Sequence, residues 1–304
     1  MTTPEQNPAT PLDAAAITHL QSWQGRSERH QDDITAAPVA SLSATLDRDD
    51  LAPVSTTSGA PGTALPPLWH WLYFLPRHRQ SELGPDGHAQ RGGFLPPVPL
   101  PRRMWAGGRL HWQATNPLRV GEPAERVSRI ESVKHKAGRS GELVFVLVQH
   151  TLHNAAGLAL TEEHDIVYRP APQPGEAAPV PTPAEKGAAW QREIVPDDVL
   201  LFRYSALTFN GHRIHYDRKY VTETEGYPGL IVHGPLIATL LADLVRRNAP
   251  DARMLSFEFR AVRPTFDLHP FRVNGQPSAD GKTVWLWAED HEGYLTMSAT
   301  ATLA

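Results

Sequence analysis

The sequence predicts an α+β fold made of two halves with the same plan, each an antiparallel sheet wrapped around a short apolar helix. Three observations favour this fold. In each half, one compact apolar segment precedes four segments rich in β-branched and other apolar residues, as expected for a buried helix followed by strands. A proline-rich linker, residues 170–187, separates the two sets. A very apolar helix must bury its surface, and an antiparallel sheet can cover it.

Composition limits the classes of function. The chain has 304 residues, enough for about two domains, and its net charge of −4 gives no general attraction to phosphate backbones. The absence of cysteine excludes disulfides, cysteine-bound zinc and thiol catalysis, and is compatible with a reducing cytoplasm. No segment approaches the roughly 18 consecutive apolar residues of a membrane-spanning helix. We therefore expect a cytoplasmic protein whose partners include neither nucleic acid nor membrane.

The first 60 residues are rich in Ala, Thr, Ser, Pro and Asp, and we expect a peripheral N-terminal extension with one amphipathic helix at residues 13–29. The first half begins at residue 61. Its apolar segment LPPLWHWLYFLP, residues 65–76, predicts a short buried helix. The glycine- and proline-rich segment 84–112 is longer than compact domains usually tolerate in a loop, so we expect it to lie over a ligand.

Strand patterns account for much of both halves. In the first half, which ends at residue 169, four segments predict an antiparallel meander: 108–114, 125–136, 142–154 and 158–169. In the second half, residues 188–304, a helix of about 14 residues begins at Gly234 and Pro235 and ends with Arg246 and Arg247, whose charges suit the helix dipole. Four further segments predict strands: 255–266, 269–277, 282–290 and 295–303.

The polar segment TFNGHRIHYD, residues 208–217, is a candidate functional loop. It places Asn210, His212 and His215 within six positions. Because the chain has fifteen histidines, an ordinary polar turn is one interpretation. A metal site is a second, but the His-x-x-His spacing lacks the glutamate of a zinc protease motif, so we expect no metal. Catalysis is the third, because the helix that starts at Gly234 presents free backbone N–H groups able to bind a developing oxyanion.

FNGHRIHYD followed by YPGLIVHGPLIATLLADL resembles the MaoC-like dehydratases and hydratases, which act on enoyl thioesters and have the hot dog fold. The resemblance covers residues 60–304, and the fold that it implies is a double hot dog. It also implies that His215 is the catalytic histidine and that Asp217 closes the motif. In the same register, Asn210 stands where the family has a catalytic aspartate, a departure that resembles the branch with two fused hot dog halves.

The resemblance implies a hydro-lyase that reversibly hydrates an enoyl-CoA thioester. The segments LPPLWHWLYFLP and GGFLPPVPLPRRMWAGGRL look like the bacterial branch that converts 3-methylfumaryl-CoA (mesaconyl-CoA) to citramalyl-CoA. His215 would transfer protons, because the ordinary pKa of histidine, about 6.5, lies near working pH. Asn210 would orient the water, and Gly234, with His233 beside it, would bind the enolate oxygen. CoA is part of the substrate, and no other cofactor is expected.

Further residues are candidates for substrate binding. A carboxylated acyl group needs a cation, for which Arg213, Arg260 and Arg263 are alternatives, and Tyr216 adjoins the catalytic histidine in the sequence. The phosphates of CoA call for additional cations, and the candidates are Arg102, Arg103, Arg218 and Lys219.

Other functions remain open from the sequence. Other (R)-specific enoyl or 3-hydroxyacyl thioester dehydratases and itaconyl-CoA hydratase are alternatives within the family, and the hot dog fold also serves thioesterases and non-catalytic acyl-CoA-binding proteins. The first half lacks an Asn-x4-His pattern, so we expect one active site per chain, with the first half closing the substrate tunnel. The expected assembly is a homodimer or a monomer.

Overall fold

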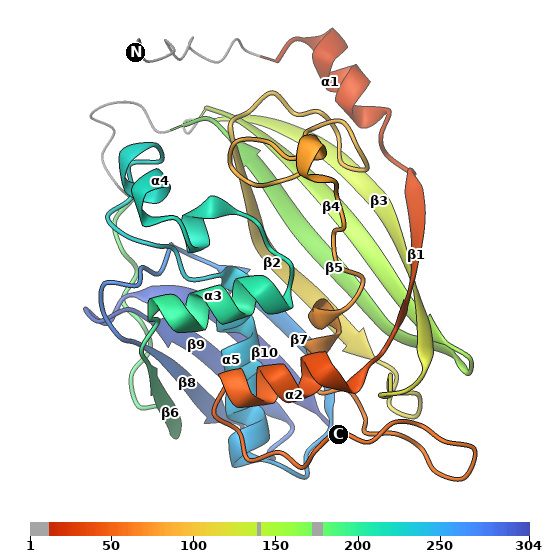
Figure 1. Cartoon of the computed structure of the whole chain (residues 1–304). Coiled ribbons are helices and arrows are strands. Elements are labelled where there is room, and N and C mark those ends of the chain that lie inside the picture. Colours follow the sequence, from red (N-terminus) through yellow and green to blue (C-terminus); the bar gives the residue numbers. More distant parts are fainter. Residues whose placement is uncertain (1–11, 139–140, 172–178) are drawn as a thin grey trace.

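The computed structural model describes residues 12–138, 141–171 and 179–304, and one ten-stranded antiparallel sheet dominates it (Figure 1). Neighbouring strands follow the order β1-β3-β4-β5-β2-β7-β10-β9-β8-β6. This sheet, covered by a few helices, confirms the predicted α+β class. The strands are β1 (Ser27–Asp33), β2 (Arg102–Trp112), β3 (Pro123–Gly138), β4 (Gly141–Asn154), β5 (Gly157–Arg169), β6 (Trp190–Ile194), β7 (Met254–Ala261), β8 (Phe271–Pro277), β9 (Thr283–Glu289) and β10 (Leu295–Leu303).

The two halves of the sheet join edge to edge through β2 and β7. Residues 107–111 of β2 pair antiparallel with residues 256–260 of β7. Two glycines allow this close approach: a Cβ on Gly107 would lie 2.5 Å from the carbonyl oxygen of Phe259, and one on Gly108 would lie 2.9 Å from the ring of Phe259. The strands therefore form one continuous sheet, and the domain boundaries at residues 61, 170 and 188 stay predictions.

The helix α5 (Gly234–Asn248) is the central helix of the second half, as predicted. Residues 236–245 are all buried, and α5 packs against β6 to β10, as Figure 1 shows. Full burial of one leucine side chain contributes roughly 2 kcal/mol, so the apolar residues of α5 supply much of the stability of this half. The four strands predicted for each half are confirmed.

The order of the strands in the first half corrects the predicted meander. β3, β4 and β5 follow one another through hairpins, but β2 pairs with β5 on one side and with β7 on the other. The predicted short helix is the 3₁₀ helix η1 (Trp69–Leu72), in which Trp69 and Leu72 are buried. It is much shorter than α5.

The N-terminal extension is not peripheral, so that prediction is wrong. The helix α1 (Ala14–Gln21) is shorter than expected, and the chain then enters β1, which pairs with β3 at the edge of the sheet. The helix α2 (Ala36–Thr45) packs against η1 and α3 (Asp198–Leu207). This segment contributes to the main core the buried side chains of Ile34, Val39, Leu42 and Leu46.

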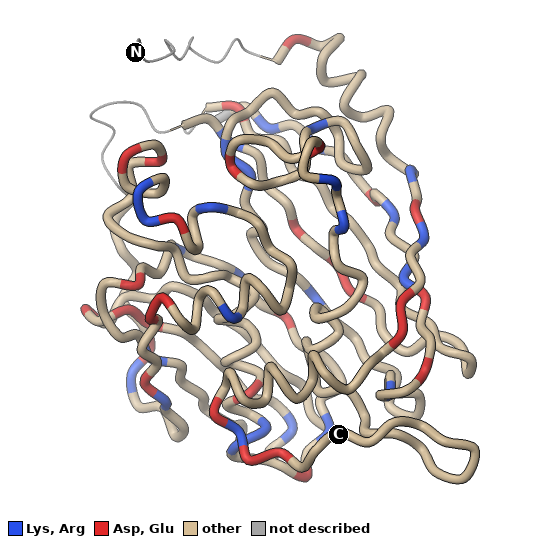
Figure 2. The backbone as a smooth tube through the Cα atoms, viewed as in Figure 1, with Lys and Arg blue, Asp and Glu red and all other residues tan. Residues whose placement is uncertain are grey.

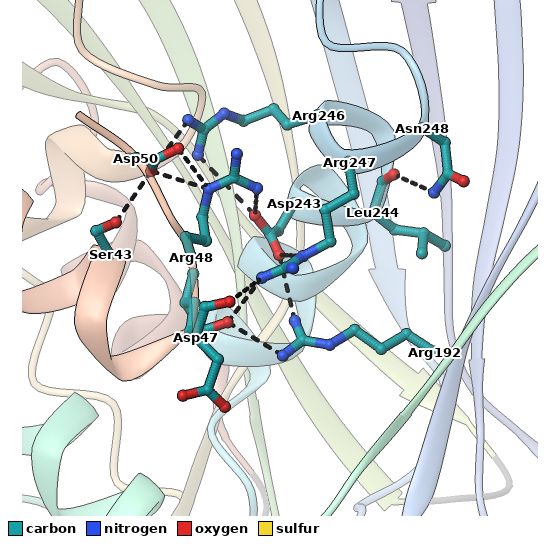
Figure 3. Close-up of polar contacts among 11 residues, drawn as sticks. Ser43, Asp47, Arg48, Asp50, Arg192, Asp243, Leu244, Arg246, Arg247 and Asn248 are labelled. Carbon is teal, nitrogen blue, oxygen red and sulfur yellow. Dashed lines mark hydrogen bonds and ion pairs between the residues drawn. The ribbon is translucent and has the colours of Figure 1, made fainter.

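A buried carboxylate ties the N-terminal segment to α5 (Figure 3). The side chain of Asp243, in the last turns of α5, is 0% exposed. Four guanidinium groups surround it, namely Arg48 and Arg247 at 2.6 Å, Arg192 at 3.3 Å and Arg246 at 3.9 Å. We call these five residues the Asp243 cluster. The sequence had suggested for Arg246 and Arg247 only a favourable place on the helix dipole.

Charges of both signs are interspersed along the described chain, as Figure 2 shows. Among the described residues, no helix combines the length and the apolar character that a membrane span requires.

Candidate active site

Short elements hold the predicted catalytic loop in place. It runs from the end of α3 through the 3₁₀ helix η3 (Arg213–His215) to the start of α4 (Arg218–Glu223). Asp217 caps α4, because its carboxylate accepts the N–H of Tyr220 at 3.0 Å. Within the loop, Asn210 Oδ1 accepts the N–H of His212 at 3.0 Å. These bonds fix the loop so that the side chain of His215 lies in the interior.

His215 is buried and held in a single tautomer. Its Nδ1 lies 2.7 Å from the carbonyl oxygen of Ile231, which can only accept, so Nδ1 carries the proton and Nε2 keeps a lone pair. Burial is the main effect that lowers the pKa of His215 to about 4, and the imidazole is therefore neutral at pH 7. A neutral imidazole with an available Nε2 is ready to accept a proton.

His233 and Gly234 form the N-terminal end of α5 beside this imidazole. The ring of His233 stacks on that of His215 with centroids 3.8 Å apart and planes 18° apart. His233 is 0% exposed, and its Nε2 lies 2.8 Å from Ser205 Oγ of α3. Gly234 is the first residue of the helix, where backbone N–H groups lack a partner within the helix. The structure thus brings the predicted oxyanion donor next to the predicted acid/base.

A turn of the first half, residues 84–88, packs against the catalytic loop. The N–H of Arg213 donates to the carbonyl oxygen of Asp86 at 2.9 Å. Gly87 has a φ of +87°, and a Cβ there would overlap the carbonyl oxygen of Gly211, so only glycine fits at this contact. The prediction that segment 84–112 lies over a ligand is untested, but this part of it lies against the loop that bears His215.

Four imidazoles line up across the contact between the halves. His88 lies 3.9 Å from His212, His212 lies 5.4 Å from His215, and His215 lies 3.8 Å from His233, all measured between ring centroids. Asp86 Oδ2 is 3.0 Å from His88 Nδ1. Sequence reasoning missed Asp86 and His88. Their signal was a polar turn that contains two glycines, in a loop of unusual length, but nothing in the sequence indicates what that turn contacts.

The other predicted substrate-binding residues do not gather around His215. Arg213 pairs with Asp217 at 2.7 Å and also donates to the carbonyl oxygen of Pro85 at 2.9 Å. Arg260 is exposed on β7 and alternates with buried phenylalanines, so it lies on the sheet face opposite α5. Tyr216 is half-exposed and donates from its hydroxyl to a loop carbonyl.

Arg263 pairs with Asp290 at 3.2 Å and lines a hollow of about 220 Å³ that none of the four imidazoles lines. The roles of Arg213, Tyr216, Arg260 and Arg263 in substrate binding stay predictions.

Arg103 is a candidate cation whose positive charge acts on two of the imidazoles. It stands opposite buried Tyr168 in the pairing of β2 with β5, and directly paired residues of antiparallel strands share a face. Burial lowers the pKa of His88 and of His212, and the positive charge of Arg103 lowers both further. By contrast, Arg102 donates to the hydroxyl of Tyr227 at 2.6 Å.

One group of residues in the described part of the chain has the composition of a metal site. One ligand atom each of Asp86, His88 and His212 lies within 4.8 Å of the others. The pair that the sequence had suggested for a metal, His212 and His215, is not this group. The expectation of no metal and no cofactor stays a prediction.

A second buried polar cluster lies in the first half. Glu162 is 2% exposed and accepts from Trp71 Nε1 at 2.8 Å, with His70 at 2.9 Å and His164 at 2.6 Å. The two histidines hold the pKa of Glu162 well below its usual range despite its burial. Because this carboxylate is ionised and accepts three hydrogen bonds, it anchors η1 to β5 and is poorly placed to act as a base.

The sequence is similar to proteins whose names describe thioester chemistry. A family model described as hydroxyacyl-thioester dehydratase type 2 matches residues 68–267. The chain is 48% identical over 285 residues to mesaconyl-C(4)-CoA hydratase of Chloroflexus aurantiacus, which covers 93% of this chain and 97% of that protein. It is 28% identical over 269 residues to the mitochondrial hydroxyacyl-thioester dehydratase type 2 of Schizosaccharomyces pombe, with coverage of 80% and 88%.

Solved structures share the fold. A MaoC-like dehydratase from Phytophthora capsici matches with a TM-score of 0.64 at 14% identity, over 95% of this chain and 98% of that one. A Mycobacterium tuberculosis protein described as having a double hotdog fold matches with a TM-score of 0.55 at 13% identity, over 92% and 96%. These likenesses confirm the double hot dog architecture.

Proposed function

Because this chain belongs to the hydroxyacyl-thioester dehydratase type 2 family, it is a hydro-lyase of acyl thioesters, and we propose that its substrate is mesaconyl-C(4)-CoA, hydrated reversibly to citramalyl-CoA. The 48% identity to the Chloroflexus aurantiacus hydratase over nearly the whole chain supports this substrate. One observation supports the site: His215 is buried and neutral, with Nε2 available beside the N-terminal end of α5.

The proposed reaction needs one proton relay and one oxyanion donor. The oxygen of a water bonds to the β-carbon while His215 Nε2 takes a proton from that water, and the π electrons of the double bond move onto the thioester oxygen. The enolate then receives the proton from His215 at its α-carbon, which restores the neutral imidazole. The N–H of Gly234 donates to the enolate oxygen, an interaction worth about 3 kcal/mol in the transition state.

A panel of enoyl-CoA thioesters tests the reaction class. We expect the protein to add the mass of one water to mesaconyl-C(4)-CoA faster than to crotonyl-CoA, and to release no thiol. Products are followed by mass spectrometry, and free thiol by a colorimetric reagent in the same samples. Prompt thiol release would show a thioesterase, and binding without turnover of any thioester would show an acyl-CoA-binding protein.

We further propose that Arg103 binds the carboxylate at the β-carbon of the substrate. The positive charge of Arg103 contributes to lowering the pKa of His88 and of His212. The guanidinium of Arg213, by contrast, is already paired with Asp217. A charge-assisted hydrogen bond is worth about 1.5 to 3 kcal/mol, or roughly 10- to 100-fold in an equilibrium constant.

Arg103→Gln is expected to lower kcat/KM for mesaconyl-C(4)-CoA at least tenfold more than for crotonyl-CoA, which has no carboxylate. Steady-state kinetics on both substrates measure this selectivity, and Arg213→Gln is assayed in parallel. Equal losses on both substrates would contradict the assignment. A selective loss in Arg213→Gln alone would assign the carboxylate to Arg213 instead.

We also propose a cytoplasmic location and an assembly that is a monomer or a homodimer. The absence of cysteine is compatible with a reducing compartment. Light scattering coupled to size-exclusion chromatography would distinguish the two assemblies by mass.

A further inference from the structure

The reacting water has two hydrogens, and each needs an acceptor if the water is to be held for attack. His215 Nε2 supplies one, because Nδ1–H of the same ring donates to the Ile231 carbonyl at 2.7 Å. A carboxylate at position 210 would supply the second. Asn210 is an amide, however: it is uncharged, it cannot take up a proton at neutral pH, and one lone pair of its oxygen accepts the N–H of His212 at 3.0 Å. The loop itself therefore offers no second basic acceptor beside His215.

The turn of the first half offers such an acceptor. Asp86 Oδ2 lies 3.0 Å from His88 Nδ1, and an ionised carboxylate can only accept, so Nδ1 carries the proton and Nε2 keeps its lone pair. The other oxygen, Asp86 Oδ1, accepts the backbone N–H of His88 at 3.0 Å. Both carboxylate oxygens thus fix His88, and its tautomer is the same as that of His215.

The position of this turn is set by backbone contacts. Gly84 and His88 are joined across it by an N–H to carbonyl bond of 2.7 Å, and the N–H of Arg213 donates to the carbonyl oxygen of Asp86 at 2.9 Å. The ring of His88 then lies against that of His212, with centroids 3.9 Å and planes 41° apart, at the end of the row of imidazoles opposite His233. His88 is therefore held rigidly on the side of the row that belongs to the first half.

We propose that His88 Nε2 accepts a hydrogen bond from the reacting water as the second acceptor beside His215, and that Asp86 holds His88 for this purpose. The inference rests on the proposed hydration reaction. On this proposal both halves contribute to the one active site: the second half supplies the proton relay and the oxyanion donor, and the first half supplies a basic acceptor that the amide of Asn210 does not provide.

Kinetics of four variants test this role. His88→Gln and Asp86→Asn are expected to lower kcat by at least tenfold on both mesaconyl-C(4)-CoA and crotonyl-CoA, with KM within about threefold and the melting temperature unchanged. His78→Ala, at an exposed histidine ten residues before His88 in the chain, is the control and should retain wild-type turnover. His88→Gln combined with Asn210→Asp should recover turnover, because the new carboxylate restores an acceptor on the loop.

Hydrogen exchange separates a role on the water from a disturbance of His215. In D₂O, the wild-type protein should exchange the α-hydrogen of citramalyl-CoA and release water. His88→Gln should continue to exchange the α-hydrogen, because His215 remains, while water release falls at least tenfold. A purely structural effect would reduce exchange and water release together.

The possible outcomes distinguish failure of the proposed function from failure of the inference about His88. If the wild-type protein hydrates no enoyl-CoA, the proposed function fails. If it does, but His88→Gln and Asp86→Asn keep wild-type turnover, or lose exchange and water release equally, the inference alone fails. A loss confined to the carboxylated substrate would make His88 a carboxylate contact, contrary to the inference. Activity abolished by a chelator, together with one equivalent of bound zinc that His88→Gln does not retain, would identify a metal site instead.

Discussion

His215→Ala is expected to lower kcat for hydration about a hundredfold or more while the protein stays folded. The substitution removes the group that takes the proton from water and returns it to the α-carbon, and such groups are typically worth 10²- to 10⁴-fold. Steady-state hydration of mesaconyl-C(4)-CoA, with circular dichroism to verify the fold, measures the effect. His111→Ala, at an exposed position on β2, serves as the matched control. Wild-type turnover in His215→Ala would remove the acid/base assignment.

The pH dependence of the wild-type enzyme follows from the same group. Because the pKa of His215 is lowered to about 4, the base is neutral through the neutral range, so kcat/KM should fall only as pH approaches about 4. As the pH falls, the free energy of unfolding decreases before kcat/KM does. The unfolded histidine has a pKa of about 6.5, so its contribution to stability is complete above that pH and is lost as pH falls toward about 4. Rates at acid pH should therefore be measured in brief pH-jump assays.

Asp243→Asn is expected to reduce the free energy of unfolding by about 3 to 5 kcal/mol. Four guanidinium groups lie around a carboxylate that is 0% exposed, and removal of its charge leaves them facing one another with little solvent. Urea unfolding followed by fluorescence measures the loss. Asp50→Asn is the matched control, because Asp50 pairs with Arg48 and Arg246 but is 27% exposed and should lose far less. A loss below about 1 kcal/mol in Asp243→Asn would contradict this account.

Local sequence patterns predict where the helices and strands of this fold lie in the chain better than they predict which of these elements lie side by side. Alternating apolar residues located the strands of both halves, and the apolar stripe located α5, because each signal lies within one segment. The position of β2 between β5 and β7 depends on the glycines Gly107 and Gly108, whose close contacts come from residues far away in the chain. Composition also concealed the role of residues 36–45, where a few buried apolar side chains among Ala, Ser and Thr suffice to pack a helix.

The same limit applies to the residues of the candidate site. His215, His233 and Gly234 could be predicted because the loop and the helix start are adjacent in sequence and match a motif. Asp86 and His88 could not be predicted, because no local sequence signal indicates which loops contact each other in the fold. Arg213 was chosen for its closeness in sequence to His215, but Asp217, four residues later, pairs with it. The spacing of four residues between Arg213 and Asp217 could have indicated this ion pair.

Separation of the two halves would uncover β2 and β7, and each would then present unpaired backbone N–H and C=O groups along its exposed edge. Such edges recruit strands from other molecules, so either half expressed by itself should tend to aggregate. The continuous sheet therefore has a consequence beyond the proposed shared site. Joining the halves in one polypeptide keeps a partner for both edges at high local concentration from the moment the second half is made, which protects the nascent chain from self-association.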